Sequence, residues 1–256
     1  MRTWLKQLDE LLRGRLTAPE LLAEGRVELP LGRFMPLAVV LGMTYGFFMG
    51  WFALLRGAPS ASTQMIASMI KLPALFLLTL VVTLPSLYVF SALLGCRLSF
   101  RATLRLLVGA VVVNLAIAAS FGPILGFFTL STTSYSFMIL LNVVLLAIGG
   151  LVGLGFLMQI LRRLASWPPW VPTGPAAVDA ANGYVAAPTP HPSDTLGQAR
   201  SIFRVWLVIY SLVGMQMGWL LRPFVGSPDL PFAWFRVREG NFFLAVVAHL
   251  KTLLDQ

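Results

Sequence analysis

An almost uncharged apolar run extends over residues 66–95, and it restricts the fold of this chain more than any other feature. Its only charged side chain is that of Lys71. Roughly 20 apolar residues in a helix cross a hydrocarbon layer of about 30 Å, so a run of this length predicts a membrane-spanning helix. The sequence therefore predicts an integral membrane protein.

The composition of the whole chain agrees with that prediction. Of its 256 residues, 57% are hydrophobic and 11% are charged, whereas about 25% are charged in a typical soluble domain. The net charge is +9, but the basic residues flank apolar segments, which indicates topology signals and lipid-headgroup contacts. We expect membrane lipids as partners and no nucleic acid.

The predicted fold class is all-α: a polytopic membrane helix bundle with about five transmembrane helices and an interfacial amphipathic helix at each end. The expected spans are residues 34–55, 66–95, 104–130, 137–161 and 202–221.

The chain divides into five predicted segments. Residues 1–33 form a cytosolic amphipathic segment, whose helix lies among lipid headgroups or packs on the protein's own cytosolic face. Residues 34–162 form a four-span domain, and residues 163–200 a proline-rich cytosolic linker. The fifth span (201–222) follows, and then an exoplasmic aromatic segment with an interfacial helix (223–256) that Asn241 caps.

The distribution of charge predicts the orientation. Basic residues are concentrated in the N-terminal segment and in alternate loops, so we expect a cytosolic N-terminus and an exoplasmic C-terminus. The 19 basic residues are arginines except for Lys6, Lys71 and Lys251, as is typical of GC-rich bacterial genomes. The expected location is a bacterial inner (cytoplasmic) membrane.

Glycines recur at intervals of four residues, which places them on one face of a helix. Small residues at this spacing let a second helix approach closely. The candidate contacts, either with other helices of this chain or with a partner or second copy, are Gly42, Gly46, Gly50, Gly149, Gly153, Gly214 and Gly218.

The sequence contains no recognisable catalytic centre. No Asp or Glu occurs between Glu28 and Asp179, and neither His191 nor His249 has metal ligands at a suitable spacing. We expect no enzyme activity, no cofactor and no metal.

Three polar residues are candidates for contact with a lipid or ligand. Lys71 lies near the predicted start of its span and could snorkel to the interface, Asn114 lies near mid-span, and Arg222 directly follows the last span. Hydrogen bonds between helices and interfacial anchoring are the alternative roles. Prolines 73, 85 and 123 are expected to interrupt the second and third spans, and such breaks expose backbone groups in transporters.

Several motifs within residues 34–162 carry a resemblance. They are Lys71-Leu72-Pro73, Pro85-Ser86-Leu87-Tyr88, the Gly122-Pro123 break and the clustered glycines of the fourth span. Together with five spans and a cytosolic N-terminus, they resemble the Yip family, the Rab/Ypt-interacting membrane proteins and their bacterial relatives. The resemblance implies a non-enzymatic membrane protein that binds or organises partners.

Two functions remain open from the sequence. The leading hypothesis is a non-enzymatic scaffold or assembly protein that binds partner membrane proteins, lipids or a second copy of itself. The alternative is a small-molecule or ion transporter or channel that uses the second and third spans.

Overall fold

The computed structural model describes residues 2–13, 29–57, 60–93, 100–165, 192–221, 233–234 and 240–255. Within these ranges the chain forms helices and no strand, which confirms the all-helical fold class. The helices are α1 (Arg2–Leu12), α3 (Leu31–Leu55), α4 (Ala61–Leu93), α5 (Phe100–Ser131), α6 (Tyr135–Ala165), α7 (Pro192–Leu221) and α8 (Phe242–Leu254).

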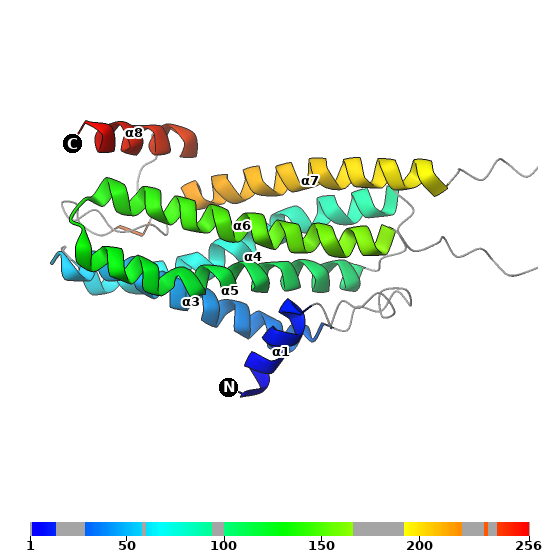
Figure 1. Cartoon of the computed structure of the whole chain (residues 1–256), viewed down its shortest axis with the longest axis horizontal. Coiled ribbons are helices and arrows are strands. Elements are labelled where there is room, and N and C mark those ends of the chain that lie inside the picture. The colour runs from blue at the N-terminus through cyan, green and yellow to red at the C-terminus, as the bar shows by residue number, and fades with distance from the viewer. Residues whose placement is uncertain are drawn as a thin grey trace, which may run out of the picture.

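Four helices are long and apolar enough to cross a membrane. Their qualifying segments are Leu31–Leu55, Ala61–Val89, Thr103–Ser131 and Tyr135–Gln159. The apolar part of α7 is shorter, Val205–Leu221, yet α7 lies along the bundle beside α4 and α6 (Figure 1). The five helices α3 to α7 alternate in direction in Figure 1, as consecutive membrane-spanning helices do.

Helix α7 begins earlier than expected, at Pro192. Residues 192–200 belong to this helix, whereas the sequence analysis assigned them to the proline-rich linker. Proline is well suited to the first turn of a helix, because the amide groups there have no hydrogen-bond acceptor within the helix and a missing amide hydrogen costs nothing. Residues 166–191 of the expected linker lie outside the described part of the chain.

The prolines in the second and third spans do not break them. Helix α4 continues through Pro73 and Pro85, and α5 continues through Pro123. Hydroxyl groups of α4 bond to carbonyl oxygens of the same helix, from Thr79 to Leu75 at 2.7 Å and from Thr83 to Thr79 at 2.7 Å. The expected interruptions are therefore absent from both helices, as membrane helices tolerate proline when their neighbours hold the backbone.

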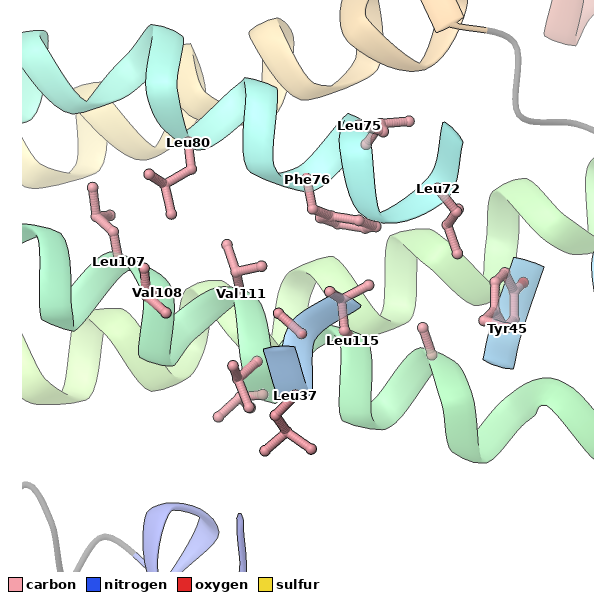
Figure 2. Close-up of a cluster of buried hydrophobic side chains, with 14 of the residues drawn as sticks. Leu37, Tyr45, Leu72, Leu75, Phe76, Leu80, Leu107, Val108, Val111 and Leu115 are labelled. Carbon is pink, nitrogen blue, oxygen red and sulfur yellow. The ribbon is translucent and has the colours of Figure 1, made fainter. Parts of the chain in front are cut away.

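The core lies between α3, α4 and α5. Figure 2 shows Leu72, Phe76 and Leu80 of α4 pointing toward α5, where Leu107 and Val111 lie. All five side chains are buried. Because lipid is as apolar as these side chains, dispersion contacts and close packing hold such a core together.

The N-terminal helix packs on the protein. Leu11 of α1 is fully buried, and it lies close to Gly109 of α5 together with Leu29. On the exposed side, Arg13 pairs with Asp9 at 2.8 Å. Of the two placements that the sequence left open, the contacts of Leu8 and Leu11 favour packing on the protein, whereas Leu12 is exposed. Residues 14–28 are outside the described ranges.

The C-terminal helix lies at the end of the bundle where α5 turns into α6 (Figure 1). The predicted cap of α8 is confirmed, since Oδ1 of Asn241 accepts a 3.0 Å hydrogen bond from the amide of Leu244. Its apolar residues differ in burial. Phe242 and Val246 are half-buried, whereas Phe243 and Val247 are exposed.

Candidate functional site

The glycines of α3 lie directly against α4. A Cβ atom on Gly46 would be 2.6 Å from the carbonyl oxygen of Ser68, and one on Gly50 would be 2.6 Å from Cα of Met65. On Gly42 it would be 2.9 Å from Cβ of Pro73. Real Cβ atoms do not approach so closely, so only glycine allows these backbones to meet. This face is occupied by the chain's own α4.

The glycines of α6 accommodate Asn114. Added Cβ atoms on Gly149 and Gly153 would be 2.9 Å from Oδ1 and Cβ of Asn114, respectively. Asn114 is only 6% exposed, and its Oδ1 has no hydrogen-bond partner in the part of the chain that the structure describes. An unpaired carbonyl in a low-dielectric interior carries the full cost of lost hydration.

A cavity of about 370 Å³ lies beside Asn114, between α4, α5, α6 and α7, with Phe242 of α8 at its edge. We refer to it as the lateral cavity. Its walls are almost entirely apolar, with Thr79, Asn114, Tyr210 and Ser211 as the polar contributors.

Small residues of both α6 and α7 line the lateral cavity. Ala147 and Gly150 line it from α6, and Gly214 and Gly218 line it from α7. Added Cβ atoms on Gly214 and Gly218 would be 3.7 and 3.6 Å from α4 side chains, which is ordinary contact. These two glycines are therefore not at a close backbone approach, in contrast to the tight crossing of α3 and α4.

Helix α7 is attached to α4 rather than to α6. The indole Nε1 of Trp206 donates a 3.0 Å hydrogen bond to Oγ of Ser86, and Trp206 is fully buried. Its ring packs beside that of Tyr210 at 5.4 Å between centroids. Contacts between α6 and α7 are sparse by comparison, so the cavity is open between them.

Lys71 lies farther inside its helix than the sequence analysis expected. Helix α4 begins at Ala61 rather than at residue 66, so Lys71 lies about 15 Å along the helix axis. It is 8% exposed, and its Nζ donates a 2.6 Å hydrogen bond to the carbonyl oxygen of Trp234. The same nitrogen lies 5.7 Å from the centre of the Trp234 ring. Arg222, the other basic candidate, is outside the described residues.

A buried polar pair went unnoticed in the sequence. The hydroxyl of Tyr45 donates to Oδ1 of Asn142 at 3.1 Å, and Nδ2 of Asn142 donates to the carbonyl of Met138 at 2.8 Å. Asn142 was visible as a polar residue of the fourth span, but nothing in the sequence indicated that Tyr45 would reach it from α3. Among the described residues, no group of three His, Cys, Asp or Glu side chains could hold a metal ion.

The fold and this site define a helical membrane protein with an apolar cavity open on its side. Comparisons with family models, with curated proteins and with solved structures found no match. The resemblance to the Yip family stays a prediction.

Proposed function

We propose that this chain is a non-enzymatic integral membrane scaffold that binds membrane lipids or a transmembrane segment of a partner protein, with the lateral cavity as the binding site. Its membrane is the bacterial inner membrane, with the N-terminus cytosolic, in keeping with the distribution of basic residues. Such a role also fits what the resemblance to the Yip family implies.

The observation that carries the proposal is the sideways opening of the cavity. Its volume of about 370 Å³ falls within the range of roughly 300–1,000 Å³ of pockets that hold small ligands. Leu151, which lines it, is 70% exposed. In a membrane this opening faces lipid, so an apolar occupant reaches it without crossing water.

Open space around a glycine of α6 supports the same site. Gly46 and Gly50 are covered by α4, and Gly153 is covered by Asn114. Gly150 of α6 lines the lateral cavity, and a Cβ atom added to it would meet nothing within 4 Å.

Two matched variants test the proposal. Gly150→Leu fills the cavity, whereas Gly155→Leu adds the same side chain to the same helix at a position that also has open space but does not line the cavity. Native mass spectrometry of the full chain, extracted in mild detergent, is expected to find lipid or a partner protein on the wild type and on Gly155→Leu, and neither on Gly150→Leu. A wild-type chain that carries no such occupant overturns the proposal.

Transport is the second candidate, and the position of Asn114 favours it. Asn114 lies at least about 20 Å from either end of α5, and the cavity reaches it. A conduit would let a water-soluble thiol reagent modify Asn114→Cys, in a Cys96→Ser background, from both sides of the membrane. If the introduced cysteine is not labelled from either side of the membrane, transport is contradicted and the scaffold proposal is unaffected.

A further inference from the structure

We infer that the lateral cavity holds a single extended acyl chain of a bilayer lipid, whose headgroup stays outside the cavity at the membrane surface. This inference rests on the proposed binding role of the cavity, and it selects the lipid over the transmembrane segment of a partner protein.

The lateral cavity is a groove that runs along the helices. Its lining residues on α6 recur at intervals of three and four residues, as one continuous helix face does. On α7 the lining extends in the same way from Tyr210 to Gly218. The α6 residues that line the groove are Val143, Leu146, Ala147, Gly150, Leu151 and Leu154.

The length and the volume of the groove both match one hydrocarbon chain. From Val143 to Leu154 the groove is about 16 Å long, at a rise of 1.5 Å per residue. A methylene group takes about as much space as a water molecule, roughly 30 Å³, so about 370 Å³ has space for about 12 of them. Bonds of about 1.5 Å that zigzag advance about 1.3 Å per carbon, so 12 carbons in an extended chain also make about 16 Å.

A partner helix is too wide for the groove. A piece of α-helix about 16 Å long and about 10 Å wide has a volume of roughly 1,300 Å³, more than three times the volume of about 370 Å³ of the cavity. Such a helix would insert only single side chains and would leave most of the groove empty. A single chain fills the space and contacts several helices at once.

The depth of the groove in the membrane fits the same occupant. Within the apolar segment Tyr135–Gln159 of α6, Val143 lies about 12 Å from one end and Leu154 about 8 Å from the other. Both ends of the groove are therefore inside the hydrocarbon layer, where the chains of bilayer lipids are and their headgroups are not.

The few polar groups in the wall do not require a polar ligand. The hydroxyls of Thr79 and Ser211 donate to backbone carbonyls of their own helices at 2.7 and 2.9 Å. Asn114 and Tyr210 also line a second cavity of about 20 Å³, which has space for one water molecule. A hydrocarbon chain therefore occupies the larger cavity without displacing a hydrogen bond that the structure shows.

The test uses two photoreactive phosphatidylcholines that differ only in where the diazirine sits on one acyl chain, next to the ester or near the end of the chain. The full chain is loaded in nanodiscs of dioleoylphosphatidylcholine that contain one probe, then transferred into mild detergent to remove loosely held lipid, and irradiated. Mass spectrometry locates the labelled residues. We expect the probe with the deep diazirine to label the groove, and the probe with the diazirine at the ester to leave it unlabelled.

Helix α6 supplies its own controls for this labelling. Leu146 and Leu154 line the groove, whereas Val144 and Val152 lie at nearly the same depths, are exposed and do not line it. Label is expected on the two leucines and not on the two valines. Gly150→Leu, which places a side chain in the groove, is expected to lose the label.

Gly155→Leu is expected to keep the label, because Gly155 does not line the groove. Equal labelling of the two leucines and the two valines would mean that lipid only surrounds the protein, and it overturns the acyl-chain inference. The proposed function then still stands if native mass spectrometry finds a partner protein that Gly150→Leu removes. A wild-type chain with neither lipid nor partner overturns both. Should Gly150→Leu fail to fold, the comparison of leucines with valines on the wild type still decides.

Discussion

Nζ of Lys71, in the interior of α4, donates a 2.6 Å hydrogen bond to the backbone carbonyl oxygen of Trp234, in the segment between α7 and α8. The ammonium group also lies 5.7 Å from the centre of the Trp234 ring. A lysine in a membrane helix is costly unless its charge finds such partners. This contact joins the C-terminal segment to the bundle across a long stretch of sequence.

Replacement of Lys71 by Met is expected to loosen the C-terminal segment. Hydrogen bonds of charged groups contribute about 1.5–3 kcal/mol, and their loss here frees the backbone near Trp234. Hydrogen exchange of the α8 amides is the measurement, with faster exchange expected in Lys71→Met. Lys251→Met, at an exposed position of α8, is the control that keeps wild-type exchange. Unchanged exchange in Lys71→Met would show that the contact does not hold the segment.

Gly46→Ala is expected to destabilise the bundle by about 1–3 kcal/mol, since the added methyl group meets the backbone of Ser68 and forces α3 away from α4. The control is Gly32→Ala in the same helix, where an added Cβ meets nothing within 4 Å. That variant should be neutral or slightly more stable because alanine favours helix. Thermal unfolding in detergent compares the two, and equal midpoints would contradict the tight crossing.

The hydrogen bond between Tyr45 and Asn142 is expected to couple α3 to α6. A double-mutant cycle with Tyr45→Phe and Asn142→Leu should give a coupling energy of about 0.6 kcal/mol and at most about 1.7 kcal/mol, as found for hydrogen bonds between membrane helices. Unfolding free energies of the four proteins supply the cycle. Additive single-mutant effects would mean that the pair contributes nothing of its own.

The docking of α8 is expected to weaken in acid. Burial lowers the pKa of His249 below its ordinary value of 6.5, and its Nδ1 lies 3.2 Å from Oγ of Ser136. Undocked α8 therefore binds more protons, so docking is strongest above pH 6.5 and declines as the pH falls through 6.5 toward the lowered pKa.

Exchange protection of α8, corrected for the intrinsic rate, should accordingly be higher at roughly pH 8 than at roughly pH 5. His249→Gln cannot take up a proton and should remove this pH dependence. Equal protection of the wild-type helix at both values would refute the role of His249.

Much of the helical architecture was predictable from local sequence. The run that contains Lys71 required a spanning helix because only a helix satisfies its own backbone within lipid. The cap at Asn241 was predictable for a related reason, since a side-chain acceptor one residue before an apolar helix satisfies a free amide of its first turn. Both properties depend on residues close together in the chain.

Predictions made from single proline residues were wrong at particular positions. Pro73, Pro85 and Pro123 suggested broken spans, yet α4 and α5 continue through them, because neighbouring helices hold the backbone in place. Proline content likewise suggested that residues 192–200 belong to a linker, whereas Pro192 opens α7.

The sequence by itself determined that this chain is a membrane helix bundle, because hydrophobic length and charge are properties of single segments. The tertiary structure alone decided that Lys71 meets Trp234, that the α3 glycines meet α4, and that Gly150 and Gly214 line the same cavity. Every span is apolar and contains several leucines, so composition alone is compatible with many pairings of the helices. Close packing of complete side-chain surfaces selects one pairing, and that choice created the cavity and left Asn114 unpaired beside it.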